Sequence, residues 1–150
     1  MAVISEQPHR NSNFLVDFGR GDSGSVLAGF AEVVFPTFHA AQAQGRQPQQ
    51  MVAQTVGHTE AAAANHLVLK RGATGSLDLY AWWDKARRGE TPGRRTVKVQ
   101  LLGEDQATVV LTWRFSNVRP LSLSYSPLNA MDGGVLMETL VLEFDRMEMG

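Results

Sequence analysis

Residues 66–89 read HLVLKRGATGSLDLYAWWDKARRG, and they predict a short β-strand followed directly by an α-helix. The strand is expected to end at the Arg-Gly pair 71–72. Ser76 is a typical helix-capping residue, and Gly89 is typical of the position after a helix. Asp78 in the first turn and two arginines in the last turn suit the helix dipole. We therefore expect one α-helix over about 76–88.

The apolar side chains of this helix repeat at helical spacing. Leu79, Trp82, Trp83 and Ala86 fall at positions i, i+3, i+4 and i+7, which places both indoles on or beside one face. That face is expected to be buried, with at least one tryptophan holding the helix against the rest of the fold.

The N-terminal part indicates a β-hairpin. An apolar run at 13–18 stops at the glycine-rich stretch 19–24, and a Val- and Phe-rich run follows at about 26–38. Gly29 and Pro36 interrupt this second run, which is typical of a bulge or bend.

Residues 40–65 show neither strand nor helix periodicity, because Gln, Ala and Gly dominate them. We predict a long loop here. A loop of this length in a compact domain usually has a function of its own or is ordered by a partner.

The C-terminal half predicts an antiparallel meander of three or four strands. They are expected at Arg95 to Leu102, Thr108 to Asn117, about Leu121 to Tyr125, and Gly134 to Met147.

The last of these strands is apolar on both faces. Leu136, Leu140, Leu142 and Phe144 share one side, whereas Val135, Met137 and Val141 share the other. Neighbouring copies of the chain, paired through strand edges, are the expected cover for the second set, although packing of two sheets could also bury both faces.

Length and composition narrow the class of protein. A chain of 150 residues fits one domain, 1–150, and a formal charge of −1 does not call for nucleic acid or an acidic membrane. The absence of cysteine excludes disulfides and thiolate sites, and it is compatible with assembly in a reducing cytoplasm. The N-terminus lacks the apolar core of a secretion signal, and no apolar run is long enough to span a bilayer.

Enzymatic motifs are not found. His39, His58 and His66 match no metal-binding spacing, and Ser23 and Ser25 do not fit the Gly-x-Ser-x-Gly nucleophile motif. The glycines of 19–24 lack the Gly-Lys-Ser/Thr of a phosphate loop. We therefore predict no catalytic, cofactor-binding or metal-binding residue, and no enzymatic activity.

We interpret the basic cluster near the helix end, and two glutamates of the last strand, as structural and not as binding residues. The cluster Lys85, Arg87, Arg88, Arg94 and Arg95 lies near two indoles, as in single-strand nucleic-acid surfaces, but cations at a helix C-terminus also satisfy its dipole. We favour the second interpretation. Glu138 and Glu143 lie on opposite faces of one strand and are expected to form salt bridges between subunits.

The ordered pattern of the chain resembles the phage tail-tube family. The resemblance rests on NFLV at 13–16, LAGFAEV at 27–33, LVLKRG at 67–72 with the following LYAW at 79–82, WRFSNVRP at 113–120 and ETLVLE at 138–143. It covers most of the chain outside residues 40–65. The Leu-Lys-Arg-Gly element with its helix is the most specific part.

The resemblance implies a mainly β fold, an antiparallel β-barrel or sandwich with one flanking helix, whose subunits close into hexameric rings. The rings would stack into the inner tube of a contractile phage tail or injection system, with a lumen that passes DNA or cargo protein. Implied partners are further copies, the sheath protein, and baseplate or tube-initiator proteins. Residues 40–65 depart from the family pattern, and we expect them to order only when another ring stacks on them.

Two alternatives remain open from the sequence. One is a specialised ring that starts the tube on the baseplate. The other is a monomeric β-sandwich that binds a sugar or peptide through Trp82, Trp83 or Tyr125.

Overall fold

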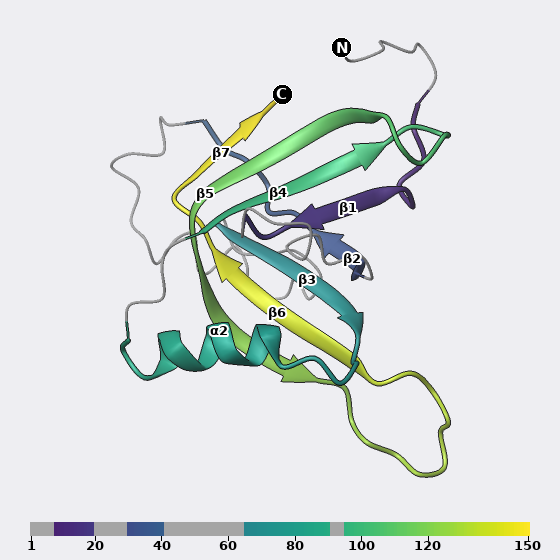
Figure 1. The fold of residues 1–150 in the computed structure, drawn as a ribbon, viewed down its shortest axis with the longest axis vertical. Helices are drawn as coiled ribbons and strands as arrows, with labels where there is room; N and C mark the ends of the chain where they lie inside the picture. Colours follow the sequence, from purple (N-terminus) through teal and green to yellow (C-terminus); the bar gives the residue numbers. More distant parts are fainter. Residues whose placement is uncertain (1–7, 20–29, 41–64, 91–94) are drawn as a thin grey trace.

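The computed structural model describes residues 8–19, 30–40, 65–90 and 95–150, and within them the fold is mainly β with one helix, as predicted (Figure 1). The elements in chain order are β1 (Phe14–Asp17), β2 (Phe30–Val34), β3 (His66–Gly72), α2 (Asp78–Arg87), β4 (Arg95–Leu102), β5 (Val109–Tyr125), β6 (Met137–Glu143) and β7 (Arg146–Met149).

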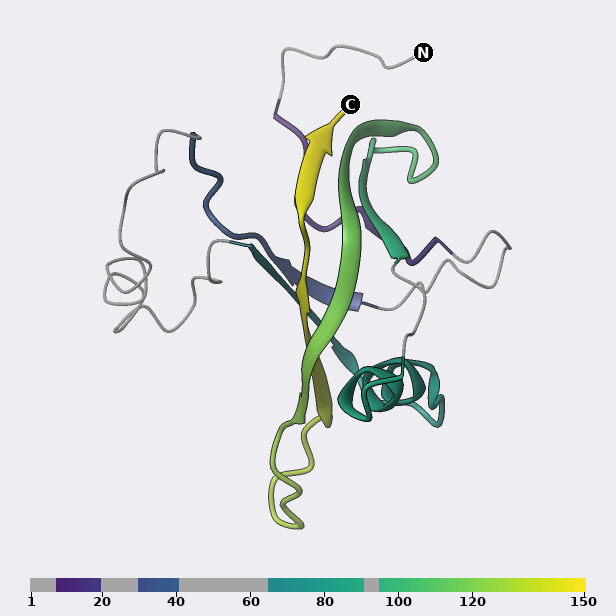
Figure 2. The same cartoon turned by 90° about the vertical axis from the view of Figure 1, so that its left-hand side faces the viewer.

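The strands form two antiparallel sheets that share β5. Sheet A runs β1-β4-β5-β7, and sheet B runs β5-β6-β3-β2. The first part of β5 pairs with β4 and β7, and the part from Arg119 onward pairs with β6 (Figure 2). Asn117 lies at the crossing with a φ of 55°, a left-handed conformation that Asn adopts more readily than most residues. The two predicted strands at 108–117 and 121–125 are therefore one bent strand.

The predicted N-terminal hairpin is wrong. β1 pairs with β4 and β2 pairs with β3, so that β1 and β2 lie at opposite ends of the strand order. No ladder joins them among the described strands, and the fold is an open sandwich and not a closed barrel. Gly19 begins the departure from β1 with a φ of +72°, and a Cβ there would lie 2.5 Å from the Thr96 carbonyl oxygen. Gly19 thus permits a close passage of the chain beside β4.

The core lies between the two sheets, and the alternation predicted for the last strand is confirmed on its inner side. Leu140 and Leu142 are fully buried, and Phe144 packs against Phe115 of β5. Val141, on the other side, is half-buried, and Val135 is 76% exposed.

The predicted strand 134–147 is two shorter strands, β6 and β7. β6 has ladder partners on both edges, β3 and β5, so it cannot offer an edge to another subunit. Edge pairing is therefore ruled out for the β6 part of the predicted strand, whose contacts must use its outer face, whereas β7 pairs on one side only.

Helix α2 confirms the predicted helix within two residues of its ends. Leu79 and Trp82 are buried, and Trp82 packs edge-on against Phe18 at 5.7 Å between centroids. Ser76 is not the N-cap residue as predicted, because that position is held by Leu77. The Ser76 hydroxyl nevertheless accepts from the Asp78 backbone N–H at 3.4 Å and donates to Asp78 Oδ1 at 2.8 Å. The start of the helix is thus held by contacts between Ser76 and Asp78.

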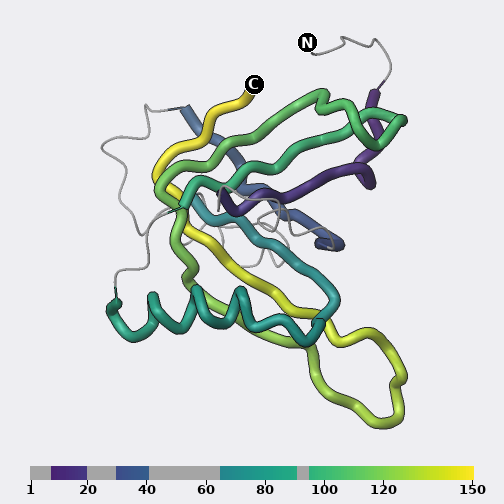
Figure 3. Tube along the Cα trace, in the orientation of Figure 1, coloured from purple at the N-terminus to yellow at the C-terminus, as the bar shows by residue number. Residues whose placement is uncertain are grey.

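The chain path separates two ends of the molecule. Figure 3 shows the connection between β5 and β6 extending away from the end that carries residues 8–12 and the C-terminus. The predicted loop 40–65 lies almost wholly outside the described residues. In the described ranges, no helix has the length and apolar character needed to cross a bilayer.

The two tryptophans of α2 should differ in their effect on stability. Trp82→Ala should lower the free energy of unfolding by about 3–5 kcal/mol, because it removes a buried indole from between the sheets and the helix. Trp83 is only half-buried, so Trp83→Ala should cost clearly less. Urea unfolding of both variants measures the difference, and equal losses would show that the helix face is wrongly assigned.

Candidate assembly surfaces

Arg71 forms the centre of a buried ionic network. Its Nε donates to Glu138 Oε1 at 2.7 Å, and its Nη2 donates to Asp78 Oδ1 at 2.8 Å. The Tyr125 hydroxyl donates to the other oxygen of Glu138 at 2.8 Å. The side chains of Arg71, Glu138 and Asp78 are only 8%, 5% and 12% exposed. The network therefore connects β3, β5, β6 and the first turn of α2.

Two pKa shifts follow from this arrangement. Burial by itself would raise the pKa of Asp78, but hydrogen bonds from Arg71 and Ser76 outweigh it and lower that pKa below its ordinary value. Burial, together with the hydrogen bond to Glu138, raises the pKa of Tyr125. Asp78 is thus held charged and Tyr125 neutral, although the second carboxylate oxygen of Asp78, Oδ2, is buried without a hydrogen-bond partner.

The predicted salt bridges between subunits are instead formed within one chain. Glu138 pairs with Arg71, and Glu143 pairs with Arg119 of β5. The sequence alone does not reveal these pairs, because they depend on the register that places β3 and β5 on either side of β6.

The basic and aromatic residues of α2 are also engaged locally. Arg87 and Arg88 both pair with Asp84, and Arg95 lies over the Trp82 ring at 4.3 Å. Trp82 is 2% exposed and therefore cannot stack on a base, sugar or peptide. These contacts favour the structural interpretation of the cluster, of which Arg94 lies outside the described residues.

The described residues give no support for a metal site, and part of the candidate set cannot be placed. The described part of the chain holds no group of three or more His, Asp or Glu that could bind a metal ion. His58, Ser23 and Ser25 lie outside the described residues.

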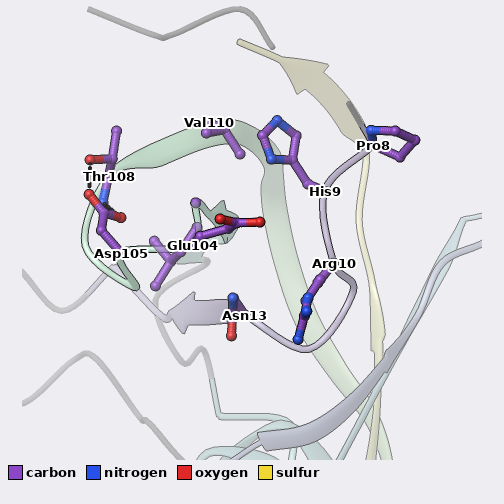
Figure 4. Close-up of a pocket in the computed structure, with 10 residues that line it drawn as sticks. Pro8, His9, Arg10, Asn13, Glu104, Asp105, Thr108 and Val110 are labelled. Atoms are coloured by element: carbon purple, nitrogen blue, oxygen red, sulfur yellow. Dashed lines mark hydrogen bonds between the residues drawn. The ribbon is translucent and has the colours of Figure 1, made fainter. Parts of the chain in front are cut away.

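A recess of about 380 Å³ lies between the N-terminal segment and the β4–β5 turn (Figure 4). His9 and Arg10 line one side of it, and Glu104 and Asp105 line the other. Asp105 accepts hydrogen bonds from the Thr108 hydroxyl and from the backbone N–H groups of Thr108 and Ala107, which lower its pKa to about 2. This carboxylate is therefore committed to the turn, and the recess offers no evident acid–base pair.

The outer faces of the two sheets differ in chemistry. Across sheet B, Val34, Val68 and Val141 lie in register and form an apolar row, each of them half-buried. Across sheet A, the corresponding row is charged: Asp17, Lys98, Arg114 and Glu148. The rows beside the valines on sheet B are polar, with Lys70 opposite Thr139 on one side and His66 opposite Glu143 on the other. The valine row is therefore a narrow apolar strip that another subunit could cover, whereas the charged row of sheet A is suited to contact with water.

Edges for strand addition are also present. In the strands that the structure describes, β1, β2 and β7 each pair on one side only. Such edges carry unpaired backbone groups that another chain can satisfy.

Comparisons with known proteins point to one family. The family model described as T4-like virus tail tube protein gp19 matches residues 10–148. A search of curated proteins finds no match.

Solved structures share the fold at low sequence identity. A chain in the sheath/tube terminator of an extracellular contractile injection system, PVC, in its extended state superposes with a TM-score of 0.69 at 18% identity, covering 98% of this chain and 99% of that one. A chain of the anti-feeding prophage (AFP) baseplate, 6-fold symmetrised, gives 0.66 at 22% identity, covering 97% of both. Hcp1 from Flavobacterium johnsoniae gives 0.54 at 13% identity, covering 91% and 94%.

The ionic network should dominate stability at neutral pH. Arg71→Met should lower the free energy of unfolding by about 3–5 kcal/mol, because Asp78 and Glu138 lose their buried partner. Arg71→Met/Glu138→Gln should recover part of the loss. Urea unfolding at pH 7 measures both.

Arg71→Met should reverse the sign with which Asp78 makes the free energy of unfolding depend on pH. In the wild type the depressed pKa of Asp78 contributes stability above its ordinary value of 3.8, and this contribution is lost as the pH falls further. In Arg71→Met burial acts without the cation and raises that pKa, so the deficit relative to wild type should shrink as the pH falls toward 4. A deficit that stays constant would show that Asp78 is not coupled to Arg71.

Proposed function

The chain belongs to the T4-like virus tail tube protein family, and on this premise we propose that it is a subunit of the inner tube of a contractile tail or contractile injection system. The family is structural and not catalytic. The match over residues 10–148 carries the proposal, because it spans the helix and every strand except the last residue of β7.

We further propose that the chain closes into hexameric rings that stack into a tube. The structural neighbours come from a contractile injection system and from an anti-feeding prophage baseplate described as 6-fold symmetrised, and Hcp1 shares the fold. The unpaired strand edges and the apolar outer row of sheet B supply contact surfaces for such a ring.

The same proposal includes a domain assignment and a set of partners for the chain. Residues 1–150 act as one tube domain that contacts further copies, the sheath and baseplate or initiator proteins, and the lumen passes DNA or cargo protein. Assembly takes place in the bacterial cytoplasm before the subunit becomes part of the particle. The charged outer row of sheet A is a suitable lining for a water-filled lumen.

Val141 tests whether the outer face of sheet B is a subunit contact. Val141→Lys should disperse rings and tubes into folded subunits, because a charge without a partner at a covered apolar contact costs several kcal/mol. Val141→Thr keeps the branched shape and adds only a hydroxyl, so it should assemble far better. Size-exclusion chromatography and negative-stain microscopy distinguish rings or tubes from a 16.4 kDa monomer.

Two results would count against the proposal. A wild-type chain that stays monomeric at all concentrations would refute self-assembly. Rings of normal size from a folded Val141→Lys variant would instead exclude this face from the contact.

A further inference from the structure

The connection between β5 and β6, residues 126–136, is a defined loop. At its base the Ser126 N–H donates to the Met137 carbonyl, and the Met137 N–H donates to the Ser126 hydroxyl oxygen, both at 2.9 Å. At its tip the Asn129 side chain accepts from the Met131 N–H, and its carbonyl accepts from the Asp132 N–H. A segment already ordered in this way loses little conformational entropy on binding. We refer to it as the β5–β6 loop.

This loop exposes large apolar side chains. Leu128, Met131 and Val135 are 86%, 93% and 76% exposed. Isolated exposed apolar residues are common on proteins, but three on one projecting loop are typical of a contact surface. The loop also carries Asp132, which has no ion-pair partner among the described residues.

A cleft with matching chemistry lies at the open seam of the sandwich, between β1 and β2. Its volume is about 620 Å³, and its apolar lining includes Phe14, Phe30, Val33, Phe35, Leu101 and Trp113. We refer to it as the β1–β2 cleft. It exists because β1 and β2 do not pair, which leaves apolar side chains between the two sheets accessible.

The charges at the cleft complement the loop. His9 and Arg10 contribute to its lining, and within the described ranges Arg10 has no ion-pair partner. Glu32 is the one acidic residue of the lining. A loop that carries apolar side chains and an aspartate therefore fits a cleft with an apolar floor and a basic segment at its margin.

Loop and cleft lie apart in the molecule. Figures 1 and 2 show the β5–β6 loop extending from one end, whereas β1 and β2, which border the cleft, lie near the middle, and residues 9–12, which also line it, lie in the other half. A subunit is thus unable to fill its own cleft with this loop, but a second copy placed end to end with it can do so.

We propose that the β5–β6 loop of one subunit docks into the β1–β2 cleft of a subunit in the next ring. This inference rests on the proposed tube function. The contact joins two different surfaces, a loop on one copy and a cleft on the next. Each subunit in a stack can therefore use its loop on one side and its cleft on the other, and the contact repeats from ring to ring without closing. It gives the stack a direction along the tube axis.

Cysteine cross-linking tests the contact directly, because the chain contains no cysteine. Met131→Cys/Asn11→Cys places one thiol on the loop and one at the cleft, both at exposed positions. A short bismaleimide added to assembled tubes should produce a ladder on denaturing gels that extends beyond six subunits. Met131→Cys/Lys85→Cys, with the second thiol on α2, is the matched control and should give no ladder.

The ladder has two outcomes that would overturn the inference. A ladder that ends at six would place the contact between neighbours of one ring. An equal ladder from the Lys85→Cys control, or none from tubes of the Asn11→Cys variant, would show that loop and cleft are not adjacent.

A charge exchange provides an independent test. Asp132→Arg and Arg10→Asp should each leave rings but abolish long tubes, and the double variant should restore them. Both residues are exposed, so thermal melting should not change. Full-length tubes from both single variants would refute the loop contact alone, whereas a wild-type chain without rings or tubes would refute the proposed function and with it the inference.

Discussion

The burial of one guanidinium, Arg71, is the constraint on which much of the structure depends. Its charge is compatible with the core only because Glu138 from the adjacent strand and Asp78 from the helix reach it at hydrogen-bond distance. The register between β3 and β6 and the position of α2 are therefore linked: a shift of either would leave a buried charge unpaired. Tyr125 adds β5 to the same network.

The sequence could predict what depends on local patterns. The helix, to within two residues of each end, the inward set of β6 and the extent of β4 follow from periodicity and flanking turn residues, and the structure agrees with them except that the N-cap is Leu77 and not Ser76. Strand pairing could not be predicted, because the run before Gly19 is equally compatible with a hairpin and with a distant partner. Arg71 and Glu138 lie 67 residues apart, so their pairing gave no local signal. The same holds for the β1–β2 cleft, which depends on two strands not pairing.

One outer row of sheet B is apolar and one outer row of sheet A is charged, and this difference bears on which surface can be covered in an assembly. Each row is set by register, so that Val68 and Val141 fall opposite each other on sheet B, as Lys98 and Arg114 do on sheet A. Two adjacent cations in one row would be unfavourable in a covered interface, but they are flanked here by Asp17 and Glu148 on the neighbouring strands. The charge pattern thus fits a wet surface, and the valine row fits a covered one.

Strand β5 has a mechanical consequence. Its backbone is continuous through both sheets, with the left-handed Asn117 between the two halves. The layers can slide past each other only if the hydrogen bonds that hold one half of β5 break, those to β4 and β7 in the first half or those to β6 in the second. A load that pulls along this strand is shared by many ladder bonds at once and not taken by one bond after another. The subunit is thereby stiff in the direction of β5.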